Sequence, residues 1–219
     1  MVPVTHQWEV SESIGDAGEF HARVPEARRA AVFHSVSTPT LVLGSSQPPD
    51  SIDRSVAERL GIDVVSRRSG GGAVLLMPGE FLWLGLVVPA GDPLWSDDVA
   101  RSMHWVGDLW QRALARVGMV TEVHTGAMRS TEWSSRICFH GLGPGEVVVG
   151  ASKVVGVSQR RTRTFARFQS MCHLRWRPET VVALTAPPRP AVPEVAKCVV
   201  TVPADAVALA DALRAELPA

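Results

Sequence analysis

Short apolar runs separated by turn-forming residues dominate the first ninety positions of the chain. Residues 40–44 and residues 62–66 read as buried strands, because aliphatic and β-branched side chains are concentrated there. Between them a helix is predicted from the capping residues 50–51 to about Leu60, with Gly61 as its stop.

Two further apolar runs occupy residues 73–77 and residues 81–88, and the turn-forming pair Pro78 and Gly79 separates them. Proline and glycine at the centre of a short connection are typical of a tight turn. The sequence therefore predicts that these two runs pair with each other as a hairpin or meander.

After Ser96 the continuous apolar runs give way to apolar residues that recur every three or four positions, which gathers side chains on one face of a helix. The face consists of Val99, Met103, Val106, Trp110, Leu114 and Val117. Asp97 and Asp98 fall in the first predicted turn, where acidic side chains favour a helix, and Gly118 follows the last apolar position. We therefore expect an amphipathic helix over residues 96–117.

The following segment alternates polar connections with strand-like runs. Residues 121–136 are mostly polar and predict a long exposed connection or a mobile flap. Strands are predicted over residues 146–150, 153–158 and 164–176, and the first two flank a turn of small residues.

Four prolines mark residues 187–193 as a linker or surface strap. Residues 203–217 read as a helix that begins with a proline. Strands in a meander, one central helix and one terminal helix together predict an α+β, or mixed α/β, single domain over residues 1–219.

Composition narrows the class of protein. A chain of 219 residues with 46% hydrophobic and 20% charged residues fits one well-filled core. The formal net charge of +0 argues against electrostatic binding of nucleic acid. Three dispersed cysteines fit a reducing compartment, so a cytoplasmic location is expected. No secretory signal is evident, and the longest apolar run, residues 81–90, is too short to cross a membrane.

One lysine stands out by its surroundings. Only two of the 22 basic side chains are lysines, and one of them, Lys153, lies within an otherwise uncharged stretch, residues 150–159. An ammonium is a compact point charge on a flexible stem, whereas a guanidinium is planar and needs more room. Lysine at this position indicates a role for a small charge, and an ordinary surface lysine is the alternative.

A run of three glycines, flanked by arginine and serine in residues 67–74, is the second informative site. Without a Cβ atom the backbone N–H groups can approach a ligand closely and adopt positive φ. The loop could wrap a phosphate or carboxylate beside an apolar channel. It is neither a Walker loop nor a dinucleotide fingerprint, because no Gly-Lys-Ser or Gly-Lys-Thr follows and a strand comes next. A flexible hairpin connection is the alternative.

Residues 67–74 and residues 153–159, together with Leu-Gly-Ser-Ser-Gln at residues 43–47, resemble the lipoate protein ligase and octanoyltransferase family, whose fold is related to that of biotin ligases. The resemblance extends over residues 35–175, and the joint occurrence in matching order is more specific than any single motif. It implies one biotin/lipoate ligase-like catalytic domain with a mixed, mostly antiparallel sheet packed by helices.

The resemblance also implies a chemistry. Lys153 would contact the acyl carbonyl and a nearby phosphate, where an ammonium stabilises developing negative charge. The residues implied to bind an acyl chain or acyl adenylate are Arg67, Ser69, Gly70, Gly71, Gly72, Ala73, Val74, Gly156 and Ser158. Lipoate or octanoate is the implied substrate, with ATP and magnesium as cofactors of a ligase, and no set of metal-ligating side chains is predicted. The implied partner is an acceptor lysine on a lipoyl domain or on the glycine cleavage H protein.

The chain departs from the ligase pattern at two places. Residues 75–77 stand where ligases carry His-Asp, and residues 136–140 stand where they carry an Asn-Asp pair for nucleotide and magnesium. Cys-Phe at the second place resembles the octanoyltransferase branch, in which a cysteine takes the acyl group from acyl carrier protein. That branch usually has a His-Gly pair where this chain has residues 168–171.

Cys138 is therefore a candidate nucleophile, and Lys153 or His140 could favour its thiolate. The alternative is that Cys138 is a small buried apolar residue. A further basic cluster, Arg160, Arg161 and Arg163, could meet an acidic acceptor or carrier protein, or could simply be a solvated strand end.

Three functional hypotheses remain open. The first is a lipoate protein ligase that forms an acyl adenylate and transfers a lipoyl or octanoyl group to the acceptor lysine. The second is an octanoyltransferase that works without ATP through a Cys138 thioester, with acyl carrier protein as its donor. The third is an acyl-binding protein of the same family that has lost turnover.

Overall fold

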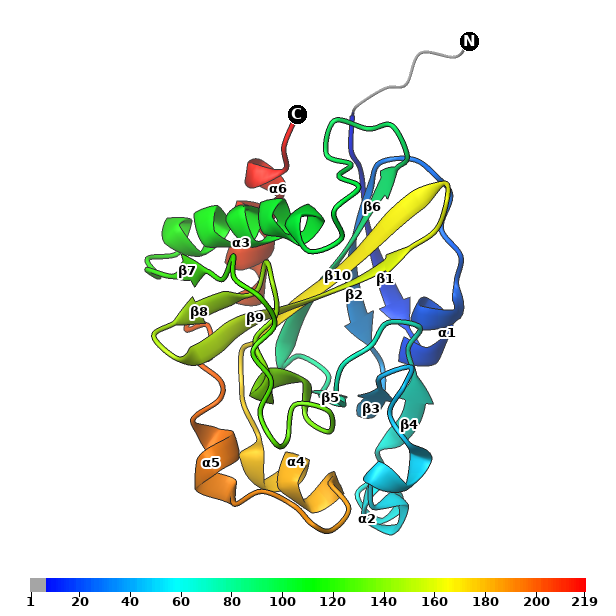
Figure 1. Ribbon diagram of the computed structural model, residues 1–219, viewed down its shortest axis with the longest axis vertical. Helices are drawn as coiled ribbons and strands as arrows, with labels where there is room; N and C mark the ends of the chain where they lie inside the picture. Colours follow the sequence, from blue (N-terminus) through cyan, green and yellow to red (C-terminus); the bar gives the residue numbers. More distant parts are fainter. Residues whose placement is uncertain (1–6) are drawn as a thin grey trace.

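The computed structural model describes residues 7–219 and contains two β-sheets with helices packed against them (Figure 1). The larger sheet has seven strands in the order β1-β2-β6-β10-β9-β8-β7. They are β1 (Glu9–Gly15), β2 (Ala30–Val36), β6 (Phe81–Pro89), β7 (Glu122–Val123), β8 (Val147–Val149), β9 (Ser152–Arg161) and β10 (Phe165–His173). Strands β1 and β2 run parallel, and the other neighbouring pairs are antiparallel. The expected mixed, mostly antiparallel sheet is confirmed.

The smaller sheet has three strands, β4 (Asp63–Ser66), β3 (Thr40–Leu43) and β5 (Val74–Leu76), in that order. The predicted hairpin between residues 73–77 and residues 81–88 is wrong, because β5 pairs with β3 whereas β6 pairs with β2 and β10. Strand β6 is buried along almost its whole length and occupies the interior of the large sheet. The Pro-Gly turn therefore carries the chain from one sheet to the other.

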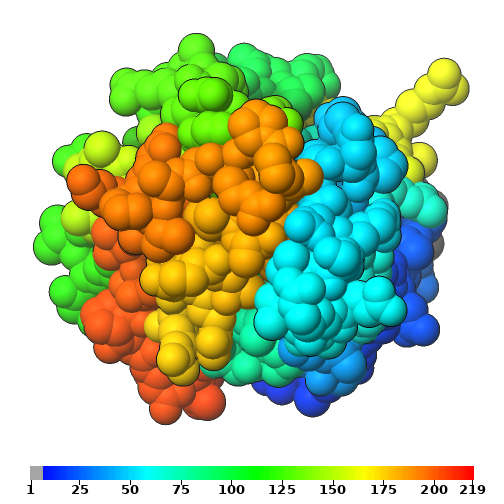
Figure 2. Space-filling view, turned by 90° about the horizontal axis from the view of Figure 1, so that it is seen from below, coloured from blue at the N-terminus to red at the C-terminus, as the bar shows by residue number. Residues whose placement is uncertain are grey.

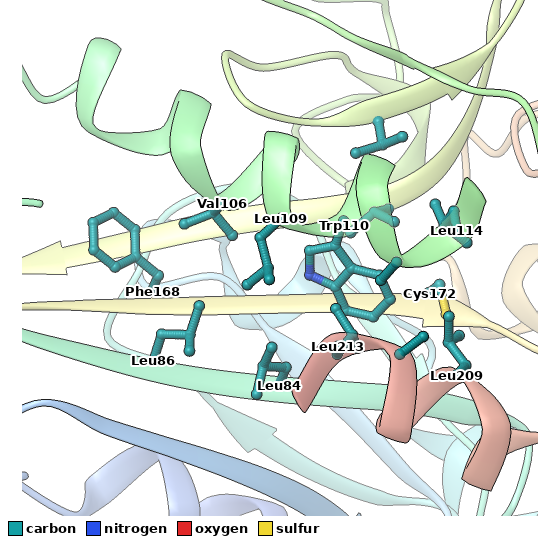
Figure 3. Packing of buried hydrophobic residues seen from close by; sticks show 14 of the residues in the cluster. Leu84, Leu86, Val106, Leu109, Trp110, Leu114, Phe168, Cys172, Leu209 and Leu213 are labelled. Atoms are coloured by element: carbon teal, nitrogen blue, oxygen red, sulfur yellow. The ribbon is translucent and has the colours of Figure 1, made fainter. Parts of the chain in front are cut away.

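Helix α3 (His104–Arg116) and helix α6 (Ala206–Glu216) pack on one face of the large sheet (Figure 1). The predicted apolar stripe is confirmed from Met103 to Val117, but Val99 is exposed and lies before the helix. Figure 3 shows Trp110 enclosed between α3, α6 and the strands. The indole N–H of Trp110 donates a hydrogen bond of 2.8 Å to Ser170 Oγ on β10, so this ring is both packed and oriented.

The start of α3 differs from the prediction. A single 3-10 turn, η2 (Arg101–Met103), precedes the helix, and Asp98 caps this turn by accepting from the N–H groups of Ala100 and Arg101. Asp98 thus acts in an initiating turn, whereas Asp97 accepts from the Trp95 indole N–H, and α3 begins at residue 104 instead of 96. Gly118, at φ 82°, follows the helix end as expected.

The remaining helices are short. They are α1 (Ala17–Ala22), α2 (Arg54–Arg59), α4 (Pro178–Leu184) and α5 (Val192–Ala196), with two further 3-10 turns, η1 (Pro49–Ser51) and η3 (Cys138–His140). The helix expected over residues 50–60 is divided, because η1 ends at Ser51 and Asp53 caps α2. Figure 2 shows α2, α4 and α5 together at the end of the molecule that carries the small sheet.

Other expectations were met in part. The predicted strands at residues 146–150, 153–158 and 164–176 correspond to β8, β9 and β10, and α6 begins at Ala206 after an Asp205 cap. The polar connection over residues 121–136 is largely exposed, but it contains β7, and Trp133 within it is buried. The proline-rich strap is shorter than expected because α5 already begins at Val192. Within residues 7–219, no helix combines the length and apolar character needed to span a bilayer.

Candidate functional site

A cavity of about 300 Å³ lies between the glycine loop, strands β9 and β10, and the turn η3. Much of its wall is apolar. The apolar contributors include Val42, Val74, Leu76, Trp83, Phe139 and Met171. A cavity of this size is at the small end of ligand pockets and suits a slender apolar ligand.

Arg67 shapes the glycine loop from inside. Its guanidinium is buried and donates to the carbonyl oxygens of Val42, Gly70 and Gly72, at 3.2, 2.8 and 2.8 Å. Burial lowers the pKa of Arg67, and the nearby Cys138 opposes this shift, so the two groups lie within electrostatic reach of each other. Arg67 therefore lines the cavity, but its hydrogen bonds hold the loop.

The conformation of the glycine loop requires glycine at two positions, one in the loop and one beside it. Gly71 has φ 97°, a backbone conformation that other residues rarely adopt. Gly44, at the end of β3, packs so closely against the Gly71 carbonyl that a Cβ atom there would overlap it. Gln47, the last residue of the 43–47 motif, bonds to Gly44 N and to the Arg136 carbonyl, which ties the loop base to the Cys138 segment.

Gly72 and Ala73 do not line the cavity, although the resemblance implies that they bind ligand. A Cβ atom on Gly72 would collide with the Ile137 backbone. Ala73 N donates to the Arg136 carbonyl at 2.8 Å, and the Ala73 carbonyl accepts from Cys138 N at 3.0 Å. These two residues therefore fasten the glycine loop to the segment that carries Cys138.

Lys153 projects from β9 to the cavity wall and is only 3% exposed. Its ammonium Nζ lies 2.7 Å from Glu146 Oε2 and donates at 3.1 Å to the backbone carbonyl of Cys138. Nζ also lies 5.2 Å from the centre of the Phe139 ring. An ammonium has three hydrogens, so these two acceptors leave one for a ligand.

Glu146 belongs to the site, and the sequence pattern did not single it out. The segment from Gly143 to Glu146 forms a tight turn closed by Glu146 N donating to the Gly143 carbonyl, with Pro144 second and Gly145 third at φ 77°. This is the arrangement of a type II turn. The only available signal was the Gly-Pro-Gly sequence before an acidic residue, which predicts the turn without indicating what the carboxylate contacts.

Cys138 is half-buried, lines the cavity, and lies one residue from Phe139 on η3. The other two cysteines differ from it, because neither lines the cavity. Burial raises the pKa of the Cys172 thiol to about 12 and that of Cys198 to about 11. Among the described cysteines, Cys138 is thus the one placed to meet a ligand.

His140 is not arranged as a base for Cys138. Its Nδ1 lies 2.9 Å from Thr131 Oγ1, its Nε2 lies 3.6 Å from Glu194 Oε1, and the residue does not line the cavity. Burial lowers the pKa of His140. The structure therefore gives His140 a place in the packing of η3 against α5.

The remaining implied ligand residues lie on the opposite walls of the cavity. Ser69 Oγ of the glycine loop donates to Ser158 Oγ on β9 at 3.2 Å, which closes the gap between loop and sheet. Gly156 lines the cavity, and a Cβ atom there would press on the Phe139 ring at 3.3 Å. Nine of the eleven site residues expected from the sequence therefore border one cavity, the exceptions being Gly72 and Ala73.

His21 of α1 also lines the cavity and was not expected from the sequence. Its ring stacks on Trp83 with 5.0 Å between centroids. Burial, together with the charges of Arg167 and Arg67, lowers the pKa of His21 to about 3. The ring is therefore neutral at neutral pH and extends the apolar wall.

The three arginines of the basic cluster, Arg160, Arg161 and Arg163, have different surroundings. Arg161 packs over the Trp95 ring and donates to the Ser96 carbonyl, so it anchors the start of the α3 region. Arg160 lies opposite Arg167 in the β9–β10 register, and Arg23, Arg68 and Arg160 together lower the pKa of Arg167 further than its burial alone. Arg163 is exposed near the β9–β10 turn, whose yellow tip projects in Figure 2.

A magnesium nucleotide fits this set of side chains poorly. Mg²⁺ is usually bound by one or two carboxylates together with substrate phosphates. Glu146 is the only carboxylate that lines the cavity in the described chain, and its oxygens already accept from Lys153, Gly143 N and Val157 N. Residues 7–219 contain no group of three or more candidate ligand side chains arranged around a metal position.

The fold thus places a largely apolar cavity next to a buried ammonium and a thiol. Residues 18–218 match the model of the lipoyl protein ligase A/B catalytic domain. The chain belongs to this family, whose members are lipoyl- and octanoyl-transferring enzymes.

Two curated relatives are octanoyltransferases named LipM. The protein from Carboxydothermus hydrogenoformans is 34% identical over 131 residues, which are 59% of this chain and 47% of that protein. The protein from Clostridioides difficile is 25% identical over 168 residues, which are 71% of this chain and 61% of that protein. The chain thus spans about half to three fifths of the length of these relatives.

Two solved structures share the fold at low sequence identity. A lipoate-protein ligase A bound with ATP superposes with a TM-score of 0.71 at 14% identity, covering 96% of this chain and 83% of that one. A bi-partite lipoate protein ligase from Thermoplasma acidophilum, studied with its E2 lipoyl domain, has a TM-score of 0.70 at 14% identity, with coverages of 94% and 80%. The expected lipoate ligase-like fold is confirmed.

Proposed function

We propose that the protein is an octanoyltransferase that works without ATP, in which Cys138 carries the acyl group as a thioester. The donor is a medium-chain acyl thioester of acyl carrier protein, and the acceptor is a lysine of a lipoyl-accepting protein. The observation that carries the proposal is the position of Cys138, which borders the apolar cavity next to the Lys153 ammonium.

Two further observations support this function over a ligase. The curated relatives at 34% and 25% identity are octanoyltransferases. Among residues 7–219, the one carboxylate on the cavity wall, Glu146, already accepts from Lys153 and two backbone N–H groups. The route through an acyl adenylate, with ATP and magnesium, stays a prediction from the sequence.

The proposed reaction consists of two acyl transfers. In the first, the Cys138 thiol loses its proton and the thiolate attacks the acyl carbon of the donor. A new S–C bond forms, the S–C bond of the donor breaks, and the departing donor thiolate takes up a proton in place of the one that Cys138 lost. In the second, the amine of the acceptor lysine attacks the Cys138 thioester, an amide bond forms, and the Cys138 thiol is released with the proton lost by the amine.

Lys153 contributes to both steps through the carbonyl oxygen. Each attack places negative charge on that oxygen, and an ammonium already in position stabilises it without reorganisation. At an effective dielectric of 20, a unit charge pair at about 4 Å is worth about 4 kcal/mol. If realised only in the transition state, this corresponds to roughly three orders of magnitude in rate.

Intact-mass measurement tests the proposal. The protein is mixed with octanoyl acyl carrier protein and no ATP, and we expect one octanoyl increment on the protein, followed by its transfer to an apo lipoyl domain. Cys138→Ser is expected to abolish both increments. Cys198→Ser is the matched control, because Cys198 does not line the cavity, and it is expected to retain them.

Two results would overturn the proposal. An increment on the lipoyl domain that requires ATP, and that survives Cys138→Ser, would identify a ligase. Octanoate or lipoate binding without any increment from either donor would identify an acyl-binding protein that lacks turnover.

A further inference from the structure

We infer that Glu146 is a positioning residue that holds the Lys153 ammonium beside the acyl carbonyl. The inference rests on the proposed acyl transfer for its rate measurements, although its structural part can be measured in the absence of any donor. It adds to the site a carboxylate that acts through Lys153 without itself touching the reacting atoms.

Three contacts fix the Glu146 carboxylate. Oε2 accepts from Gly143 N at 2.6 Å and from Lys153 Nζ at 2.7 Å, and Oε1 accepts from Val157 N at 3.2 Å. The carboxylate thus bridges its own turn and two points of β9, four residues apart. Its side chain is 6% exposed, so water competes little for these contacts.

The turn that carries Glu146 is itself held in place by its neighbours. Gly145 packs against the Met103 backbone so tightly that a Cβ atom would overlap the Met103 carbonyl, and Gly145 N donates to the His124 carbonyl at 2.7 Å. The Glu146 carbonyl in turn accepts from His124 N at 2.8 Å. Neighbours on both sides therefore fix the backbone from which Glu146 projects.

The consequence for Lys153 is directional. A lysine ammonium stands on a flexible stem of four carbons. Without a partner, a buried ammonium would turn toward any available acceptor. With Glu146 on one side and the Cys138 carbonyl on the other, the remaining N–H is restricted to the cavity side. A displacement of about 1 Å at a reacting centre can reduce the rate about a hundredfold.

Nuclear magnetic resonance of the lysine side chains tests the positioning directly. The sequence has only two lysines, Lys153 and the exposed Lys197, so protein labelled with ¹⁵N at lysine Nζ gives two ammonium signals. In the wild type we expect slow hydrogen exchange at Lys153. In Glu146→Gln, with the fold checked by circular dichroism, we expect fast exchange at Lys153 and an unchanged Lys197 signal. Unchanged Lys153 exchange would overturn the inference.

A double-mutant cycle tests the catalytic part in single-turnover transfer. We expect Glu146→Gln to lower the rate about 10- to 100-fold with little change in the donor concentration at half-saturation, and Glu146→Asp to recover part of the loss. In a Lys153→Ala background, Glu146→Gln is expected to have no further effect, because the residue acts through the lysine. An equal fold-loss in both backgrounds would overturn the inference.

The outcomes separate this inference from the proposed function. If no Cys138 thioester forms, the proposed function fails, and the cycle is then run with lipoate and ATP, or the exchange measurement stands alone. If Glu146→Gln does not fold, Glu146→Asp provides the comparison, because a shortened carboxylate is expected to loosen Lys153 while keeping the charge. Slow Lys153 exchange and an unchanged rate in Glu146→Asp would then contradict the inference.

Discussion

At the scale of single residues, the space around Lys153 decides which cation it admits. Nζ is enclosed by Glu146, the Cys138 carbonyl and the Phe139 ring, and the side chain is 3% exposed. A planar guanidinium needs more room and directs its hydrogens in a fork. The chain uses arginine at 20 of its 22 basic positions, so lysine here meets a steric requirement.

We predict that Lys153→Arg will not support transfer. The expected loss is about 10²- to 10³-fold in single-turnover rate, similar to that of Lys153→Ala, because the charge no longer reaches the carbonyl oxygen in the right geometry. The measurement is acyl transfer to an apo lipoyl domain, with circular dichroism as the check of folding. Near wild-type transfer by Lys153→Arg would show that any cation suffices.

The sequence alone reached part of this site. Lys153 and the glycine run could be found because each departs from its local composition, and Lys153, Gly70 and Gly71 line the cavity. Glu146 and His21 could not, since an acidic residue after a turn and a histidine on a short helix are ordinary in sequence. Glu146 contacts Lys153 because the chain turns back between β8 and β9, and His21 contacts Trp83, which is distant along the chain, only in the folded protein.

At the scale of elements, helix α3 supports the sheet that forms the cavity wall. Trp110 is fully buried and donates to Ser170 Oγ, and that hydroxyl donates onward to the Leu84 carbonyl on β6. Ser170 itself lines the cavity. The helix is therefore linked to the cavity wall through one indole ring and one hydroxyl group.

Trp110→Ala is expected to lower the free energy of unfolding by about 3–5 kcal/mol, because it removes a large buried ring. Trp110→Phe should lower it less, since most of the packing remains while the hydrogen bond to Ser170 is lost. Urea denaturation followed by circular dichroism measures both. Asp108→Ala, at an exposed position of the same helix, is the control and should change stability by less than about 0.5 kcal/mol.

The individual helices and strands could be predicted from sequence better than the pairing of the strands. The periodicity of α3 and the runs of β8, β9 and β10 are local signals, and those elements were found. The hairpin expected between β5 and β6 failed because strand pairing is not local. A buried run such as β6 gains more from two partners inside the large sheet than from one neighbour across a turn.

At the scale of the whole molecule, charge is balanced overall but not everywhere. A group of arginines surrounds Arg167: Arg23 and Arg68 are exposed, and Arg160 is half-buried. No described carboxylate lies within ion-pair distance of any of these four arginines. Arg68 and Arg160 flank the contact between Ser69 and Ser158 at the cavity wall. This unpaired positive surface favours an acidic partner protein.

We predict that Arg68→Glu combined with Arg160→Glu will raise the KM for a carrier-protein donor several-fold and weaken its dependence on salt. The KM for a small octanoyl thioester should not change. Arg54→Glu, on α2, is the control for a single reversal of surface charge. Equal effects on both donors would assign these arginines to the cavity instead of to the partner.

Three buried histidines make the fold sensitive to acid. Burial lowers the pKa of His21, His34 and His173 to about 3 from an ordinary value of 6.5. The unfolded chain therefore binds these protons first. Their contribution to stability is complete above about pH 6.5 and is lost as pH falls from there toward 3.

Each of these histidines is expected to lower stability by roughly 1 kcal/mol per pH unit within that window. Urea midpoints at pH 7, 6 and 5 measure the slope above the range where most carboxylates titrate. His34→Gln should reduce the slope, because it removes one of the three titrating rings; His34 and His21 pack on Trp83, and His173 packs on Phe139 and Trp176. A slope unchanged in this variant would contradict the assignment.

The scarcity of lysine has a last consequence. A protein that holds an activated acyl group can modify its own amines, and here a buried Lys153 and an exposed Lys197 are the only side-chain amines. Arginine solubilises the surface without offering a comparable nucleophile, because its guanidinium stays protonated. Under the proposed chemistry, Lys197 is therefore the single exposed side-chain amine that the transferred group could modify, and the rest of the surface offers it no lysine.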